Sequence, residues 1–196
     1  QIGLIPGAGG TQRVPRMLGI EGAAPLLLEG KRLKPEAALK AGLIDALVDD
    51  KAQMMAAAKK FIAENPFIMQ PWDEKNKKGQ IVGRKNFRVP KGNIQSPKGV
   101  QVLMPGTALL MDKTKGNYPA QLAIMSCVYE GLQVPMEQAL DIESRYFTQV
   151  LRTPEARGMV RTLFFGIQDA NKGEARPKDI PKVDIQTVAI LGAGMM

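Results

Sequence analysis

The feature that most constrains the fold is a glycine-rich turn near the start of the sequence. Residues 6–11 read Pro-Gly-Ala-Gly-Gly-Thr and follow the short apolar run at residues 2–5. Glycine permits a left-handed backbone and close approach of other groups. Before a helix, such a turn directs backbone N–H groups at an anion, an enolate oxygen or a held water. It is no phosphate-binding P-loop, because no Gly-Lys-Ser/Thr closes it. A purely structural tight turn is the alternative.

Apolar periodicity along the rest of the chain predicts mostly helices. We expect Thr11 to cap the first of them and Pro15 to end or restart it. Pro35 and Gly42 suit the start and the end of the third helix. Residues 70–99 are expected to form a surface loop or hairpin. The predicted helices span residues 12–18, 22–28, 35–41, 51–63, 120–131, 136–151 and 154–168, and short strands are predicted at 2–5, 43–48 and 188–191.

The absence of histidine excludes several chemistries. A chain without histidine has no Ser-His-Asp triad, Cys-His pair or histidine metal site, and we predict no metal site. The lone Cys127 forms no internal disulfide, fits a reducing compartment and is expected to be a buried apolar side chain. No apolar run is long enough to span a membrane, and we expect no secretory signal.

The net charge of +8 leaves open a non-enzymatic function in binding acidic partners. Because aromatic residues make up only 5% of the chain, a stacking platform for single-stranded nucleic acid is not expected. A solvated loop is the simplest interpretation of the basic residues. The alternative is a non-catalytic module whose loop at residues 75–98 binds acidic partners. The local basic cluster comprises Lys75, Lys77, Lys78, Arg84, Lys85 and Arg88.

Acidic residues gather in the predicted helix 136–151. Asp141 and Arg145 are spaced four residues apart, which predicts a surface ion pair. We interpret the neighbouring Glu137 and Glu143 as support for the helix and not as an acid-base dyad.

Two motifs carry a family resemblance. Residues 4–13, Leu-Ile-Pro-Gly-Ala-Gly-Gly-Thr-Gln-Arg, with Pro15 and Arg16 after them, resemble the signature of the enoyl-CoA hydratase (crotonase) superfamily. The phrase Ala-Gly-Leu-Ile-Asp-Ala-Leu-Val at residues 41–48 resembles a second phrase of that family at the expected distance. Two matches in order and register make the resemblance specific. The same fold hosts thioester isomerases and hydrolases, which remain alternatives.

Later segments are similar to the multifunctional fatty-acid oxidation α subunits. In that family a linker joins the hydratase domain to a 3-hydroxyacyl-CoA dehydrogenase with a Rossmann domain. Residues 188–196 resemble the first strand and Gly-x-Gly of that second domain. The other similar segments are residues 71–73, 104–106, 113–120, 153–156 and 163–165.

The resemblance implies an α/β fold in three parts. Residues 1–170 would be the C-terminal, mostly helical half of a crotonase-like (ββα spiral) domain. Residues 171–184 would be a linker, and residues 185–196 would begin an NAD-binding Rossmann domain. Since the sequence starts at Gln1 and stops just after a Gly-x-Gly, both ends are expected to lie inside a longer polypeptide.

The resemblance also implies a set of site residues. Family members hydrate trans-2-enoyl-CoA with two glutamates, both expected upstream of Gln1, and the dehydrogenase domain then oxidises the product with NAD. Gly7 matches the turn that supplies a water-holding amide, and Pro6 and Gly7 would border the substrate. Phe164 would contact the acyl or coenzyme A pocket. Gly192 and Gly194 would begin the NAD motif, which needs a third glycine and a helix beyond Met196.

The same family comparison sets expectations for partners. Without the upstream glutamates, the 196 residues alone are expected to be inactive and to bind no NAD. We expect an acyl-CoA substrate, a thiolase subunit as partner, an oligomeric parent and no nucleic acid. The compartment would be the bacterial cytoplasm or the mitochondrial matrix. With half of a domain absent, apolar helix faces would be left uncovered.

Overall fold

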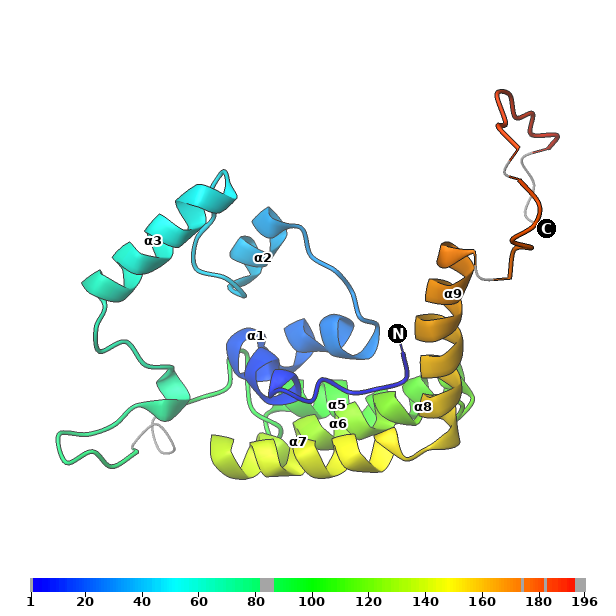
Figure 1. The fold of residues 1–196 in the computed structure, drawn as a ribbon. Helices are drawn as coiled ribbons and strands as arrows, with labels where there is room; N and C mark the ends of the chain where they lie inside the picture. Colours follow the sequence, from blue (N-terminus) through cyan, green and yellow to red (C-terminus); the bar gives the residue numbers. More distant parts are fainter. Residues whose placement is uncertain (1, 82–86, 174, 182, 193–196) are drawn as a thin grey trace.

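A computed structural model describes residues 2–81, 87–173, 175–181 and 183–192, whose regular secondary structure is helical and is joined by long irregular connections (Figure 1). These residues contain no β-strand, only an isolated antiparallel bridge between Lys75 and Ile81. The helices are α1 (Gly10–Leu28), α2 (Pro35–Ala41), α3 (Lys51–Glu64), the 3₁₀ turn η1 (Pro71–Asp73), α5 (Pro97–Thr114), α6 (Pro119–Gly131), α7 (Met136–Leu151), α8 (Pro154–Met159), the π-helical η2 (Val160–Gly166) and α9 (Ile167–Lys172).

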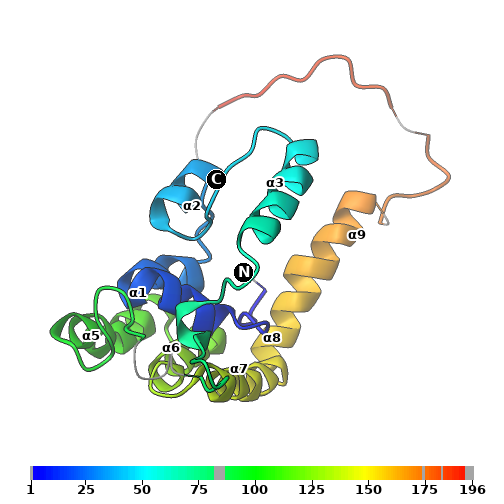
Figure 2. The same ribbon diagram turned by 90° about the vertical axis from the view of Figure 1, so that its left-hand side faces the viewer.

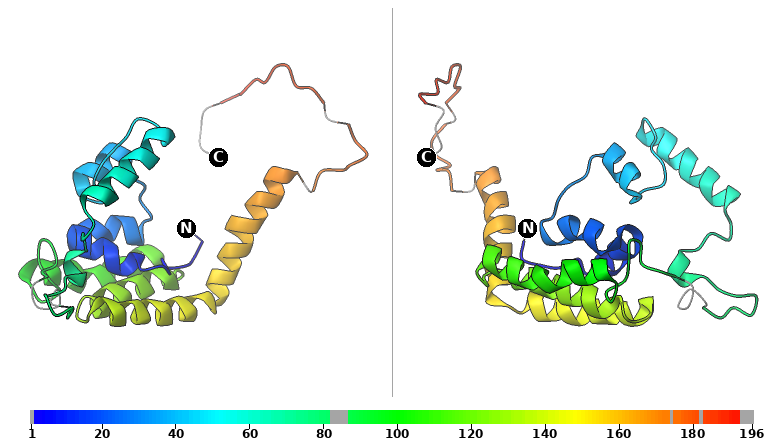
Figure 3. Two further views of the ribbon diagram at one scale, coloured as in Figure 1. Left: turned by 60° about the vertical axis from the view of Figure 1, so that its left-hand side comes forward. Right: turned by 180° about the vertical axis from the view of Figure 1, so that it is seen from behind.

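Helix α6 lies at the centre of the packed body. It contacts α1, α5 and α7, and α1 lies across the layer that α5, α6 and α7 form (Figures 1 and 2). Small side chains at Ala120, Ala123 and Cys127 let neighbouring helices approach α6 closely. Helices α2 and α3 stand farther out on the other side of α1, and α9 points away from the layer (Figure 3). The buried core comprises Ile5, Ile20, Ile94, Ala120, Ala123, Ile124, Cys127, Val128, Val150 and Ala156.

Capping signals locate several helices as predicted. The bounds of α2 and α7 coincide with the predictions, and Gly42 ends α2 in the left-handed conformation with φ of 80°. The Thr153 hydroxyl accepts a hydrogen bond from the Ala156 amide at 3.2 Å and so caps α8. The sequence analysis missed α5. Its Ser96-Pro97 start is the same kind of signal, but Gly99, Pro105 and Gly106 hide the helical pattern.

Helix α1 corrects two predictions about its start. The N-cap is Gly9, which has a left-handed backbone with φ of 87°, and the Thr11 hydroxyl makes no cap. Pro15 lies inside the helix and neither ends nor restarts it. The two predicted helices are one element with a kink at Gly19, where φ is 77° and ψ is 169°. A Cβ atom at this glycine would lie 2.4 Å from the Pro90 carbonyl oxygen.

The three predicted strands are not formed. Residues 2–5, 43–48 and 188–191 are extended or irregular, although all three runs are apolar. A strand needs a hydrogen-bonded neighbour, and the described part of the chain provides none for these runs. Residues 185–192 are exposed throughout. The described residues therefore show only helices, consistent with a helical half of a domain, and the α/β class stays a prediction.

The expected uncovered apolar surface is present. Helix α3 has no buried residue, although Phe61 and Ile62 lie on it. Phe67, just beyond its end, is 89% exposed. Side chains of this size are normally buried or covered by a partner.

Candidate functional site

The glycine-rich turn is held by one buried carboxylate. The Gly9 amide donates to Glu143 Oε1 at 2.5 Å, and the Thr11 amide donates to Glu143 Oε2 at 2.9 Å. The Thr11 hydroxyl donates to the same Oε2 at 2.5 Å. Glu143 is 2% exposed and Thr11 is fully buried, although they are 132 residues apart in the chain. The turn is thus fixed from α7 and not by its own side chains.

The N-terminus of helix α1 explains why the Glu143 carboxylate lies beside the turn. The first N–H groups of a helix have no partner inside the helix, and the N-terminus carries a partial positive charge. Gly9, the N-cap of α1, has no side chain that could accept a hydrogen bond. Glu143 supplies both the acceptor oxygens and the negative charge from another helix.

Glu143 is a site residue that the sequence analysis missed. Its position held a usable signal, because the buried face of α7 includes Ala139, Ile142 and Val150 and Glu143 lies within that face. An acid inside an apolar stripe needs hydrogen-bond partners. The predicted ion pair between Asp141 and Arg145 is not formed, since the ion pairs among the described residues involve other side chains.

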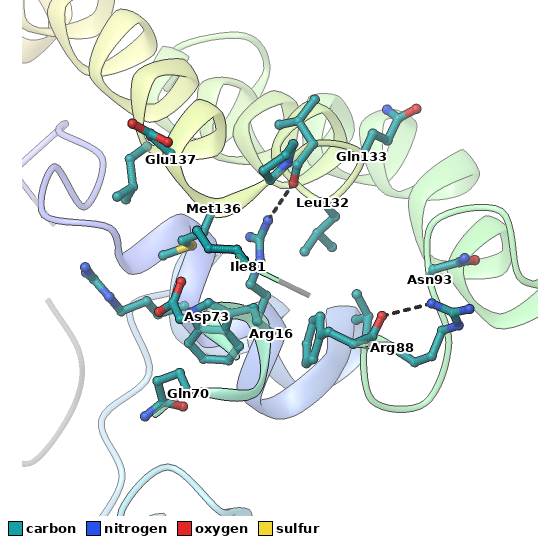
Figure 4. Close-up of a pocket in the computed structure, with 17 residues that line it drawn as sticks. Arg16, Gln70, Asp73, Ile81, Arg88, Asn93, Leu132, Gln133, Met136 and Glu137 are labelled. Carbon is teal, nitrogen blue, oxygen red and sulfur yellow. Dashed lines mark hydrogen bonds between the residues drawn. The ribbon is translucent and has the colours of Figure 1, made fainter. Parts of the chain in front are cut away.

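A second buried polar layer ties α1 to the end of α6. Gln12 Nε2 donates to the Cys127 carbonyl at 2.9 Å, and Arg16 Nη1 donates to Gln12 Oε1 at 3.0 Å. Arg16 Nη2 donates to the carbonyl oxygen of Gly131 at 2.8 Å. It also donates to the carbonyl oxygen of Val134 at 3.2 Å (Figure 4). Burial lowers the pKa of Arg16 to about 10, against the opposing effect of Asp73. The guanidinium therefore stays charged at neutral pH.

The backbone at Gly7 is available to a ligand. Gly7 is exposed, and no described residue forms a hydrogen bond with its amide. The Phe147 ring packs against it so closely that a Cβ atom at Gly7 would lie 2.8 Å from the ring. Pro6 is half-buried and lies against Gly10 in the same turn. Gly7 therefore packs against α7, and Pro6 packs within the turn itself.

Phe164 lies in a different environment. It belongs to η2, is 46% exposed, and packs edge-on against Phe165 with ring centroids 5.2 Å apart. The aromatic ring against the turn is Phe147. The contact of Phe164 with an acyl or coenzyme A group stays a prediction.

A cavity of about 560 Å³ lies near the turn, but none of its described lining residues belongs to residues 6–11. Leu140 and Arg13 border it and also contact Gly9, and Arg13 Nη1 donates to the Ala8 carbonyl at 2.5 Å. The opposite wall carries the buried Trp72, whose ring meets the Phe87 ring edge-on with centroids 5.6 Å apart. Figure 4 shows charged groups of both signs around the cavity, including Arg16, Arg88, Asp73 and Glu137. Its volume lies within the range of small-molecule sites.

The described residues near the C-terminus form no dinucleotide site. Gly192 has a left-handed backbone with φ of 93°, but residues 185–192 are exposed and form no strand, and Gly194 lies outside the described residues. A pyrophosphate site needs a strand, a glycine turn and a helix N-terminus together. The described residues at this end do not form that cradle.

The described residues contain no group of three His, Cys, Asp or Glu side chains that could hold a metal ion. None of their helices combines the length and the apolar character needed to cross a bilayer. The basic cluster is only partly described, because Arg84 and Lys85 lie outside the described residues.

Cys127 is fully buried, as predicted, and it makes folding sensitive to alkaline pH. Burial raises the pKa of its thiol to about 12 from 9.0, while a hydrogen bond with Thr11 lowers it and the charge of Glu143 raises it further. Above pH 9 the unfolded thiol ionises while the folded thiol keeps its proton, so stability falls as pH rises. We expect urea unfolding to show about 1.4 kcal/mol less stability at pH 10 from this group. Cys127→Ala should lack that contribution, and equal pH slopes for both proteins would contradict the assignment.

The chain is similar to known proteins both around the turn and along its whole length. Residues 1–67, which include the whole turn, match the family described as enoyl-CoA hydratase/isomerase. The chain is also similar along its whole length to proteins named fatty acid oxidation complex subunit alpha. The relative from Shewanella amazonensis is 36% identical over 206 residues, that from Shewanella halifaxensis 33% over 199, and that from Aliivibrio fischeri 32% over 202.

In each of these comparisons, all of this chain aligns with 26% of the relative. The chain therefore spans about a quarter of the length of the curated relatives that it matches. These matches confirm the resemblance drawn from the glycine turn and from the later motifs.

Proposed function

We propose that this chain is part of a fatty-acid oxidation enzyme and forms one wall of its enoyl-CoA hydratase site. The parent would add water to trans-2-enoyl-CoA and give 3-hydroxyacyl-CoA. The observation that carries the proposal is the exposed residue Gly7, whose amide bonds to no described residue, in a turn that Glu143 holds in place. The similarity to alpha subunits along the whole chain supports it.

The turn would act by holding water and not by transferring protons. A backbone N–H fixed in place stabilises a bound water or a developing oxyanion without reorganisation. The acid-base work needs carboxylates near the reacting carbon atoms, and Glu143 is buried with its oxygens already accepting three hydrogen bonds. The proton-transferring glutamates would be residues that precede Gln1 in the parent, so the 196 residues alone would be inactive.

The rest of the parent would supply the second step. We propose that residues 1–170 belong to the hydratase domain, that 171–184 form a linker, and that 185–196 begin a dehydrogenase domain. NAD would accept the hydride from 3-hydroxyacyl-CoA there. A thiolase subunit, an oligomeric assembly and a bacterial cytoplasmic or mitochondrial matrix location are part of the same proposal.

Binding of a coenzyme A thioester tests the proposal. We expect butyryl-CoA to bind the purified chain saturably in calorimetry, and crotonyl-CoA to show no hydration above the protein-free rate. Gly7→Ala should weaken binding about tenfold or more, because its Cβ would displace the Phe147 ring and shift the turn. Gly158→Ala is the matched control, since nothing lies within 4 Å of the added Cβ atom.

The alternatives predict different results. Hydration of crotonyl-CoA by the chain alone would refute the proposed inactivity. Absence of thioester binding, together with binding of RNA or anionic vesicles that collapses with salt, would favour the basic binding module. Circular dichroism of Gly7→Ala separates a misfolded variant from a folded one with a shifted turn.

A further inference from the structure

The cavity near the glycine turn has a buried cation in its wall. We call it the Arg16 cavity, and it lies between the first half of α1, the turn η1, residues 87–93 and the start of α7. Arg16 lines it and is only 4% exposed, and Figure 4 shows its side chain among the other lining residues. A buried charge is costly unless an opposite charge compensates it. Arg16 in this position therefore calls for a negative partner.

The protein partners of Arg16 are neutral. Its guanidinium donates to the backbone and side-chain oxygens of Gln12 and to the carbonyl oxygens of Gly131 and Val134. The ion pairs among the described residues do not include Arg16. Asp73 acts on Arg16 through its charge, but burial outweighs this effect and lowers the pKa of the guanidinium. No carboxylate of the described part of the chain is thus in contact with this cation.

The buried carboxylate of Glu143 does not contact Arg16 either. Glu143 accepts from the Thr11 hydroxyl, Thr11 Oγ1 accepts from Gln12, and the Gln12 side-chain oxygen accepts from Arg16. Two neutral side chains therefore separate the two buried charges. Both oxygens of Glu143 are already occupied by the turn.

One donor of Arg16 is left for a ligand. All the hydrogen bonds that Arg16 donates to described residues come from Nη1 and Nη2, so Nε–H has no acceptor there. Nε also keeps some accessible surface, because Gln121 Oε1 is the only side-chain N or O atom of the described residues that is both fully buried and unpaired. Since Arg16 lines the cavity, Nε–H can donate to an acceptor placed inside it. Arg13 lies one turn earlier on the same face of α1 and brings a second, exposed guanidinium to the cavity.

The opposite wall suits a flat apolar group. The buried Trp72 ring and the half-buried Phe87 ring meet edge-on there, and Met136 and Leu140 contribute apolar side chains from α7. Aromatic rings pack well in offset-stacked or edge-on arrangements. The described charged groups around the cavity are three cations and two anions: Arg13, Arg16, Arg88, Asp73 and Glu137.

We propose that the Arg16 cavity binds an aromatic carboxylate. Its carboxylate accepts from Arg16 Nε–H and pairs with Arg13, and its ring lies against Trp72. The cavity volume of about 560 Å³ accommodates a ligand of this class. The proposal does not depend on the hydratase activity, because no described lining residue belongs to the turn at residues 6–11.

Three probes of similar shape test the proposal with the full chain. They are para-tert-butylbenzoate, its neutral carboxamide, and para-tert-butylcyclohexanecarboxylate, which keeps the charge but has no aromatic ring. Trp72 is the only tryptophan of the chain and lines the cavity, so its fluorescence reports binding there. We expect the benzoate to change this fluorescence saturably. The carboxamide should bind about tenfold more weakly, and the cyclohexane acid about threefold more weakly.

Two variants test the contacts of the bound carboxylate. Arg13→Gln should weaken benzoate binding about threefold or more, because one paired cation is lost. Asp73→Asn should instead tighten it about threefold, because the only half-buried acid around the cavity no longer repels the ligand. Arg157→Gln removes the same charge as Arg13→Gln from an exposed position on α8 outside the described lining, so the affinity should stay within about twofold. Circular dichroism checks that each variant is folded.

Nitrogen-15 NMR of the arginine side chains reads the central contact directly. The Arg16 Nε–H resonance should shift with the benzoate and not with an equal concentration of chloride. This measurement needs no substitution at Arg16, whose bonds to Gln12, Gly131 and Val134 also support the fold.

Four results would overturn the proposal. They are a Trp72 signal that does not saturate, equal affinities for the benzoate and the carboxamide, an Asp73→Asn variant that does not bind more tightly, and competitive displacement of the benzoate by butyryl-CoA. The last result would assign the cavity to the thioester site. Failure of butyryl-CoA to bind at all would count against the proposed hydratase site and leave the Arg16 cavity unaffected.

Discussion

Glu143→Ala is expected to destabilise the chain by about 3–5 kcal/mol. The substitution leaves the buried amides of Gly9 and Thr11, and the Thr11 hydroxyl, without an acceptor. Removing one partner of a buried charged network is among the most costly single changes. It also takes the negative charge from the N-terminus of α1. Urea unfolding followed by circular dichroism measures the loss.

Asp141→Ala is the matched control for this experiment. Asp141 lies on the same helix, is exposed and forms no ion pair with a described residue, so we expect a change within about 0.5 kcal/mol. Glu143→Gln should fall between the two. It keeps the size of the side chain but replaces one acceptor oxygen with an NH₂ group that faces a donor. A loss below about 1 kcal/mol in Glu143→Ala would show that the turn holds itself.

Gly19→Ala should be nearly as damaging, by about 3–4 kcal/mol. The residue has φ of 77° and ψ of 169°, a backbone region that is essentially restricted to glycine. The new Cβ atom would also lie 2.4 Å from the Pro90 carbonyl oxygen, so the loop that packs on the kink would have to move. The midpoint of thermal or urea unfolding reports the effect.

Gly158→Ala again provides the comparison. Gly158 lies in α8 with an ordinary helical backbone and open space around it. Alanine there should stabilise the chain by up to about 1 kcal/mol, since it forms helices better than glycine. If both alanine variants had similar stabilities, the kink at Gly19 would not depend on glycine.

Local signals explain which parts of the fold could be predicted. Helix α2 could be predicted from Pro35 and Gly42, and the start of α8 from Thr153 and Pro154, because capping depends on neighbouring residues. The strand predictions were wrong because strand formation does not depend on neighbouring residues alone. An apolar run becomes a strand only beside another strand, and no local pattern shows whether that neighbour exists.

The candidate site, like the strands, could be predicted only where neighbouring residues define it. The sequence predicts the turn at residues 6–11 from its glycines and assigns Pro6 and Gly7 to it. What shapes the turn is Glu143, which the local pattern of α7 presents as one of several helical acids. Its place in the apolar face of α7 indicates that this acid faces inward, but only the fold reveals that it reaches Gly9 and Thr11. The cavity near the turn likewise combines side chains from distant segments.

The hydrogen bonds of Gly9 and Thr11 to Glu143 also impose an order of events during protein synthesis. A ribosome adds roughly 5–20 residues each second, so Glu143 is made roughly 7–26 s after Thr11, which precedes it by 132 residues. Throughout that interval the nascent turn has no carboxylate to close on. Its final shape must therefore wait until α7 has been translated and has docked.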